Sequence, residues 1–299
     1  MLAVYELLKG VISENLILCD EPMKNHTSFK IGGNADFLVL PQSIEQIEAL
    51  VKTLKENNIN YVVIGNGSNL LVDDEGIRGV VIKIGRNFSG VECTGESITA
   101  QCGALLSRIS NVALENELTG FEFAGGIPGT LGGALVMNAG AYGGEMKDVV
   151  LKTKYIDING NICEVTGEEH KFGYRKSVFQ KGDIVLETTL KLSKGNKNEI
   201  SLKINELNSK RREKQPLELP SAGSTFKRPE GHFAGKLIED AGLGGFKIGG
   251  ASVSQKHCGF IVSDGTATCK DVLSLIEYVQ NIVFEKFSVK LEPEVRYIK

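Results

Sequence analysis

Apolar positions along the first part of the chain repeat with two different periods, which predicts strands and helices in alternation. Apolar residues from Ile44 to Leu54 fall on one helical face, and Ser43 with Gln46 forms a capping box at its start. The expected strands of this α/β unit are short apolar runs at Phe37–Leu40, Tyr61–Ile64 and Gly79–Ile84. Apolar residues also recur at regular intervals in the first sixteen residues and predict a short amphipathic helix.

The middle of the chain predicts an α+β unit. A helix is expected whose apolar face includes Leu105, Ile109, Val112 and Leu114 and which ends by Gly120. Asn159-Gly160 is typical of a two-residue hairpin turn. The expected strands are near Val91–Gln101 and at Tyr155–Ile158, Ile162–Val165 and Ile184–Leu192.

A polar loop at Lys194–Asn198 marks a boundary near Gly195, and a third unit follows it. A helix is expected to begin at Cys269, capped by Thr268 with Asp271 at its third position. The other expected elements are helices at Glu199–Arg212 and Ala234–Ala241, the latter stopped by Gly242, and strands at Gly259–Ser263 and Val289–Ile298. The whole pattern predicts an α+β fold in three parts, 1–85, 86–195 and 196–299.

Composition narrows the classes of function. The chain has 299 residues, 41% hydrophobic and 24% charged, without an apolar stretch of about 20 residues or a secretory signal. Six cysteines without a CxxC pair favour the reducing cytoplasm, and four histidines without an HxxxH pair give no support for a metal site. A net charge of −3 offers no basic surface for nucleic acid. We therefore expect a small-molecule partner, with no membrane, metal or obligate protein partner indicated.

Glycine is the compositional excess, with 35 residues, and the first glycine-rich turn is 65–69. It follows a predicted buried strand, where successive backbone N–H groups can converge on a phosphate. The dinucleotide fingerprint GxGxxG fails, because its third glycine would fall at Leu70, which continues as apolar chain. A pyrophosphate nest is thus favoured over a Rossmann site, and an ordinary β-turn is the alternative.

The second glycine-rich segment is denser, with eight glycines among residues 125–144. It is not a Walker loop, because no Lys-Ser/Thr pair follows its glycines. Small residues let the main chain lie against a flat ring or a diphosphate, and Asn138-Ala139-Gly140-Ala141 adds polar groups with little bulk. The segment therefore predicts a flavin or phosphate cradle, and close helix packing is the alternative.

Several motifs, in one order, make a family resemblance visible. They are NHTSFKIGG from Asn25, GNGSNLLV from Gly65, GGIPGTLGGALVMNAGAYGGE from Gly125, YRKS from Tyr174, SAGSTFK from Ser221 and LEPEVR from Leu291. Together they resemble the UDP-N-acetylenolpyruvoylglucosamine reductase (MurB) family over nearly 270 residues.

The resemblance implies a two-part FAD-binding module of the p-cresol-methylhydroxylase/vanillyl-alcohol-oxidase type, followed by an α/β substrate-binding domain. The parts would be 1–85 and 86–195 for FAD and 196–299 for substrate. The reaction implied is reduction of the enolpyruvyl group of UDP-N-acetylglucosamine enolpyruvate to UDP-N-acetylmuramate, with non-covalent FAD and NADPH. The cofactor residues implied are Gly65, Asn66, Gly67, Ser68, Asn69, Gly126, Ile127, Pro128, Gly129, Thr130, Gly133, Asn138, Ala139 and Gly140.

The resemblance also assigns the catalytic residues. Ser224 stands at the family's proton donor, Arg175 would stabilise the developing enolate-like charge, and Glu294 matches the catalytic glutamate. Strand alternation places Glu292 and Glu294 on the same face, so only the match to the residue before Val295 separates them. Without the resemblance, Ser224 is a turn residue, and the Glu and Arg side chains are solvated charges.

Substrate contacts are expected from Tyr174 and Lys214, whereas the basic run Lys210-Arg211-Arg212 is typical of a solvated helix face. Arg228 departs from the family's asparagine, and a guanidinium there can bind the UDP diphosphate. The short length indicates the type II branch, without an extra substrate-covering loop. The alternatives are another flavin oxidoreductase of the same cofactor fold, and a flavin- or nucleotide-binding regulatory module without turnover.

Overall fold

The computed structural model describes residues 2–179 and 182–299, which form two compact units. The first unit comprises the residues up to Leu18, Phe37–Asn66 and Gly79–Arg211. The second comprises Cys19–Asp36, Gly67–Arg78 and Arg212–Lys299. Each unit is assembled from separated stretches of chain. The three-part division at residues 85 and 195 remains a prediction.

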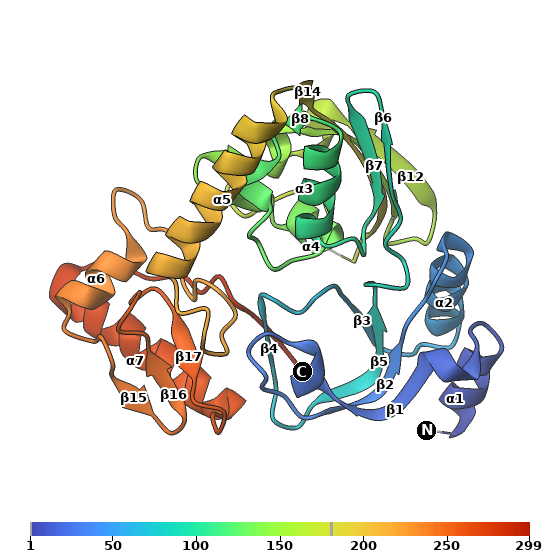
Figure 1. Cartoon of the computed structure of the whole chain (residues 1–299). Helices are drawn as coiled ribbons and strands as arrows, with labels where there is room; N and C mark the ends of the chain where they lie inside the picture. The colour runs from blue at the N-terminus through green and yellow to red at the C-terminus, as the bar shows by residue number, and fades with distance from the viewer. Residues whose placement is uncertain (1, 180–181) are drawn as a thin grey trace. The chain divides into compact units, whose positions relative to one another are not determined.

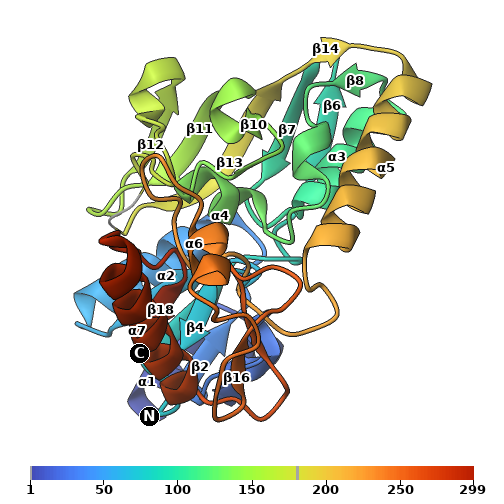
Figure 2. The ribbon, with the colours of Figure 1, turned by 90° about the vertical axis from the view of Figure 1, so that its left-hand side faces the viewer.

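A five-stranded antiparallel sheet dominates the first unit, with strand order β12-β11-β13-β7-β6. Helices α3 (Leu106–Glu115) and α4 (Leu131–Val136) pack against it, α3 on β6 and β7 (Figure 1) and α4 on β7 and β13 (Figure 2). Its strands are β6 (Val91–Thr94), β7 (Ser97–Gln101), β11 (Val150–Ile156), β12 (Ile162–Thr166) and β13 (Ile184–Lys191).

A four-stranded sheet has the order β1-β2-β5-β3, in which β3 (Tyr61–Ile64) runs parallel to β5 (Ile77–Lys83). Helix α2 (Ile44–Glu56) buries its apolar face in the core cluster that contains Val80 and Ile82 of β5. The parallel register of β3 and β5 is typical of α/β chains, in which parallel strands are joined by crossover connections. The neighbouring elements are α1 (Leu2–Lys9), β1 (Ile17–Pro22) and β2 (Asn34–Val39).

The second unit contains the three-stranded sheet β15-β16-β17 and the long helix α7 (Cys269–Phe287), which contacts β15, β16 and α6 (Figure 1). Val272, Leu275 and Val279 of α7 are fully buried in its separate apolar core. Strand β18 (Arg296–Ile298) pairs in parallel with β4 (Leu70–Val72). The other elements are α6 (Ala234–Asp240), β15 (Lys247–Ile248), β16 (Ala251–Val253) and β17 (Ile261–Ser263).

Helix α5 (Lys197–Lys214) carries the chain from residues of the first unit to residues of the second. The remaining elements are short, namely β8 (Leu118–Thr119), β9 (Gly140–Ala141), β10 (Gly144–Glu145), β14 (Ser193–Lys194) and 3₁₀ turns at Glu14–Leu16, Met23–His26, Glu122–Ala124, Met146–Asp148 and Gly167–His170.

Several sequence predictions were wrong in detail. Helix α3 begins after Leu105, which is 42% exposed and not part of its apolar face, and ends at Glu115 rather than Gly120. The loop around Asn159-Gly160 is longer than two residues, because Asp157 N donates to Asn161 O and the Asp157 carboxylate accepts from the backbone of both asparagines. The Asp157 side chain thus builds its own turn.

The start of α2 and the end of the chain also differ from expectation. Ser43 Oγ accepts from Gln46 N as predicted, but the Gln46 side chain accepts from Gln42 N, so the capping box is only half formed. The predicted terminal strand Val289–Ile298 contracts to β18, and alternation along it cannot place Glu292 and Glu294 on one face.

Candidate active site

The two glycine-rich segments meet in the first unit. Asn66, just after β3, donates from Nδ2 to the Pro128 carbonyl oxygen at 2.7 Å. A Cβ on Gly65 would lie 2.2 Å from Thr130 Oγ1, so glycine is needed for this close approach. Two turns that the sequence separates by about sixty residues therefore lie in contact with each other.

The second half of the Gly65–Asn69 turn belongs to the second unit and is fixed by the chain itself. Gly67 has a φ of 66°, and a Cβ there would lie 2.0 Å from the His26 carbonyl oxygen. Asn69 Nδ2 donates to Glu294 O at 3.1 Å, and Asn69 O accepts from Arg296 N at 2.9 Å. The lack of a side chain at Gly67 and the side-chain amide of Asn69 are therefore both needed for contacts within the second unit.

Gly133, in contrast, lies at a position where the rest of the chain leaves room for a side chain. A Cβ on it would meet only Thr130 Oγ1, at 3.7 Å, which is an ordinary contact distance. Gly133 lies in the first turn of α4, is exposed, and a helical glycine costs about 0.5–1 kcal/mol relative to alanine. The residues present thus fit a bound group that comes close to this backbone, such as a flavin nucleotide.

Arg175 lies at the tip of a tight turn of the first unit. Gly173 and Lys176 exchange backbone hydrogen bonds at 2.9 and 3.1 Å, so Tyr174 and Arg175 form the two-residue loop between them. The backbone of Arg175 is left-handed, with a φ of 53°. Asn138 Nδ2 donates to Gly173 O at 3.1 Å, and Ser177 Oγ donates to Val136 O at 2.9 Å. The predicted catalytic arginine is thus tied to the end of α4.

Ser224 and Glu294 come together on paired segments of the second unit. Thr225, next to Ser224, accepts from Glu294 N at 2.7 Å through its carbonyl oxygen, and Phe226 bridges Pro293. The structure also separates the two glutamates. Glu292 is exposed and forms an ion pair with Lys227 at 3.0 Å, while Glu294 is only partly exposed. The two glutamates therefore differ in exposure and in the contacts that their segment makes.

The predicted substrate residues are exposed and lie in different units. Tyr174 is 53% exposed in the first unit, with the Arg175 guanidinium carbon 5.3 Å from its ring centroid. Lys214 ends α5 at the surface of the second unit. In the same unit the Arg228 guanidinium stacks on Phe233, with its carbon 4.0 Å from the ring centroid.

Arg211 is a residue that the sequence reasoning missed. It is only 9% exposed, so the prediction of a solvated face over Lys210-Arg211-Arg212 was wrong at this residue. Its Nη1 donates to the Gly126 carbonyl oxygen, and its Nε finds no partner among the residues that the structure describes. The signal that could have revealed it is spacing, because Arg211 follows the buried Ile200 and Leu207 of α5 by eleven and four residues.

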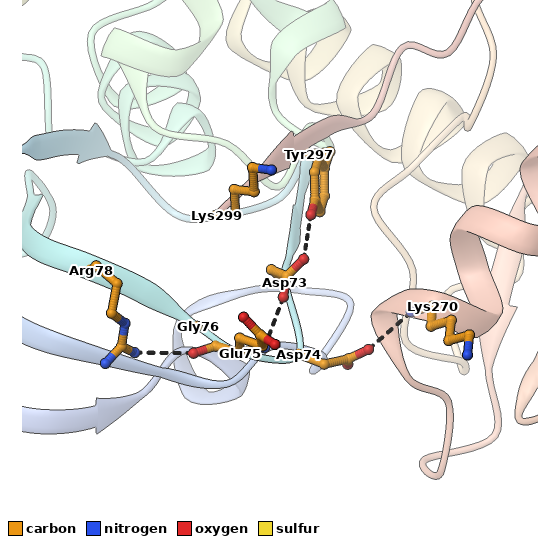
Figure 3. Close-up of a pocket in the computed structure, with 8 residues that line it drawn as sticks. All are labelled: Asp73, Asp74, Glu75, Gly76, Arg78, Lys270, Tyr297 and Lys299. Atoms are coloured by element: carbon orange, nitrogen blue, oxygen red, sulfur yellow. Dashed lines mark hydrogen bonds between the residues drawn. The ribbon is translucent and has the colours of Figure 1, made fainter.

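A polar pocket of about 720 Å³ lies in the second unit (Figure 3). The Asp74 carboxylate accepts from Cys269 N at 2.7 Å and Lys270 N at 3.0 Å and so caps α7, while the Tyr297 hydroxyl donates to Asp73. These carboxylates bind the chain's own groups, and none of the residues predicted for the site lines the pocket. Its lining is Asp73, Asp74, Glu75, Gly76, Arg78, Lys270, Tyr297 and Lys299.

Other kinds of site find little support in the described part of the chain. Across residues 2–179 and 182–299, no three His, Cys, Asp or Glu side chains are grouped to hold a metal ion. All six cysteines are free. None of the helices described combines the length and the apolar character needed to span a membrane.

Comparisons with known proteins define the class first. A family model described as an FAD binding domain matches residues 35–166. The solved structure of Phl p 4.0202, a glucose dehydrogenase, shares the fold with a TM-score of 0.52 at 16% identity, over 65% of this chain and 44% of that one. The chain is thus an α+β protein with an FAD-binding fold, as expected from the sequence.

A second family model, the C-terminal domain of UDP-N-acetylenolpyruvoylglucosamine reductase, matches residues 215–298. Enzymes of that name from Caldanaerobacter subterraneus subsp. tengcongensis and Clostridioides difficile are 56% and 52% identical, over 97% and 99% of this chain and 96% and 97% of theirs. The crystal structure of the MurB reductase from Thermus caldophilus matches with a TM-score of 0.81 at 36% identity, covering 95% of this chain and 98% of that one. The chain belongs to the UDP-N-acetylenolpyruvoylglucosamine reductase family.

Proposed function

We propose that this chain reduces the enolpyruvyl group of UDP-N-acetylglucosamine enolpyruvate to the lactyl ether of UDP-N-acetylmuramate, with FAD as bound cofactor and NADPH as hydride donor. The reaction provides a peptidoglycan precursor, and we place it in the cytoplasm, which suits six free thiols. The observation that carries the proposal is local. One short stretch, Thr130–Asn138, meets the Gly65 turn at one end and holds the Arg175 turn at the other.

Each predicted residue then has a defined task. The backbone of the two glycine-rich segments holds FAD, with Gly133 leaving space for it, and FAD supplies hydride transfer between NADPH and the vinyl carbon of the substrate. Arg175 stabilises the charge that develops beside the substrate carboxylate, and Glu294 occupies the position of the family's catalytic glutamate. Ser224 donates the proton, and Ser224→Ala is expected to slow product formation about 10²–10⁴-fold while flavin reduction by NADPH continues.

The test is an anaerobic assay of the purified yellow protein. NADPH oxidation is expected to depend on the enolpyruvyl UDP-sugar, and mass spectrometry is expected to find the sugar heavier by two hydrogen atoms. NADPH oxidation that ignores this sugar but responds to another acceptor would favour the alternative, another flavin oxidoreductase of the same fold. A protein that binds FAD but turns over no acceptor would favour a regulatory module.

The UDP diphosphate is assigned to Arg228, with Lys214 as the competing cation. Stacking on Phe233 holds the Arg228 guanidinium in one orientation, which lowers the entropy cost of a bidentate phosphate contact. Because the diphosphate is bound equally before and during hydride transfer, Arg228→Ala should raise KM for the UDP-sugar with kcat little changed. An unchanged KM in Arg228→Ala, together with a raised KM in Lys214→Ala, would move the diphosphate to Lys214.

A further inference from the structure

The turn that carries Arg175 needs support from outside itself. Arg175 has a left-handed backbone, which residues with a Cβ adopt at a cost in free energy and keep only where neighbouring contacts hold them. The exchange of backbone hydrogen bonds between Gly173 and Lys176 closes the loop, but these bonds move with the loop. What fixes the turn relative to the rest of the first unit must be contacts to other segments.

Asn138 provides the first of these contacts. Its side chain is 1% exposed, and Nδ2 donates to Gly173 O at 3.1 Å and to Glu145 Oε2 at 2.9 Å. Its Oδ1 accepts from Lys147 N at 3.0 Å. Both N–H groups and the oxygen of the amide are therefore used within the chain. The backbone of Asn138 is itself left-handed, with a φ of 41°.

Ser177 provides the second contact, on the other side of the loop. Its hydroxyl is buried and donates to Val136 O at 2.9 Å, while Phe179 N donates to the same Ser177 oxygen at 3.3 Å. Val136 is the last residue of α4, and Asn138 follows two residues later. Two side-chain hydrogen bonds, one before and one after Arg175, thus bind the turn to the same end of the same helix.

We propose that Asn138 and Ser177 are positioning residues for Arg175, holding its turn against the helix whose other end forms the predicted cofactor cradle. The proposal rests on the role given to Arg175 under the proposed function. It also reassigns Asn138, because an amide saturated by Gly173, Glu145 and Lys147 has no N–H left for the cofactor.

The test combines single and double variants with separate measurement of the two half-reactions. Asn138→Gly removes the amide and suits the left-handed backbone, and Ser177→Ala removes one hydroxyl. Each is made alone and together with Arg175→Ala. Thr188→Val serves as the control, because it removes a comparably buried hydrogen bond, to Thr153 at 3.1 Å, that joins β11 to β13 and is not made by the Arg175 turn.

Asn138→Gly should slow flavin reoxidation by the enolpyruvyl UDP-sugar about 10²-fold, the usual effect of a misplaced catalytic group. Ser177→Ala should slow it about fivefold, the worth of one neutral hydrogen bond. FAD retention and flavin reduction by NADPH should match those of Thr188→Val. In the Arg175→Ala background neither change should slow reoxidation by more than about twofold, because the positioned group is already gone.

Two results would overturn the proposal. Full additivity with Arg175→Ala would mean that Asn138 and Ser177 act independently of it, and loss of FAD from a folded Asn138→Gly protein would return Asn138 to the cofactor. If Asn138→Gly does not fold, the coupling of Ser177→Ala to Arg175→Ala decides. Normal reoxidation in Arg175→Ala alone is a different failure, because it removes the proposed role of Arg175 itself.

Discussion

A side chain at Gly133 would affect both the stability of α4 and the space beside this helix. The chain would accept a Cβ at this exposed helical position, so Gly133→Ala should stabilise the apoprotein by about 0.5–1 kcal/mol. If the flavin nucleotide passes close to this backbone, the added methyl group should weaken FAD binding by about 1–3 kcal/mol. Thermal unfolding of the apoprotein and titration with FAD measure the two effects separately.

Gly85→Ala is the matched control, because a Cβ there would meet only Lys83 Cε at 3.9 Å and the residue belongs to neither glycine-rich segment. FAD affinity should be unchanged in this control. Equal FAD affinity in Gly133→Ala and in the unmodified protein would mean that the cofactor does not approach Gly133.

Single residues also mark the limit of what the sequence predicts. Glu292 and Glu294 are two residues apart and equivalent in any periodic pattern, yet one pairs with Lys227 at the surface and the other is anchored through the backbone of Thr225. The contacts that distinguish the two glutamates are made to residues more than sixty positions earlier in the sequence. Local pattern carries no information on such partners, so only family resemblance could choose between them.

At the scale of elements, predictions succeeded where the cause is local. Thr268 and Asp271 form the predicted capping box at the start of α7, because both partners lie within one helical turn. Strand β3 was also predicted at its observed position from a short apolar run. The terminal strand was overestimated, because its length is set by pairing with the three residues of β4, more than two hundred positions earlier.

Helix α5 also makes one buried contact with the predicted cofactor cradle, through Arg211. Arg211→Ala removes the hydrogen bond from Nη1 to the Gly126 carbonyl oxygen, inside the predicted cofactor cradle. A hydrogen bond to a charged group contributes about 1.5–3 kcal/mol, so FAD affinity should fall roughly 10- to 100-fold. Fluorescence titration of the apoprotein with FAD measures this.

Arg212→Ala, one residue along and exposed, provides the control and should retain normal FAD affinity. If the two variants bind FAD equally well, the Gly126 carbonyl does not depend on Arg211 for its orientation. The unfolding temperature of the Arg211→Ala apoprotein distinguishes a local effect from general loss of structure.

At the scale of the whole molecule, each unit encloses a histidine whose charged form is disfavoured. Burial lowers the pKa of His170 in the first unit, where its ring stacks on Phe172 and contacts Gly167 O and Thr153 Oγ1. Burial likewise lowers the pKa of His257 in the second unit. Both rings are therefore neutral in the folded protein at a pH where an exposed histidine begins to take up a proton.

This sets the pH dependence of stability. The unfolded chain protonates these histidines near pH 6.5, whereas the folded chain does so only at lower pH, so between the two values the unfolded state binds more protons. The contribution of these two histidines to stability therefore falls as pH drops below about 6.5, before most carboxylates begin to titrate.

His170→Gln, which cannot titrate, should flatten the dependence of the unfolding temperature on pH between about 7 and 5. The informative quantity is the slope, because the substitution also changes packing against Phe172 and shifts stability at every pH. His257→Gln should flatten the same slope through the other unit, and the double variant should flatten it most, since the two rings lie in separate units. A slope in His170→Gln equal to that of the unmodified protein would mean that folding does not change the pKa of His170, contrary to its burial against Phe172 and Thr153.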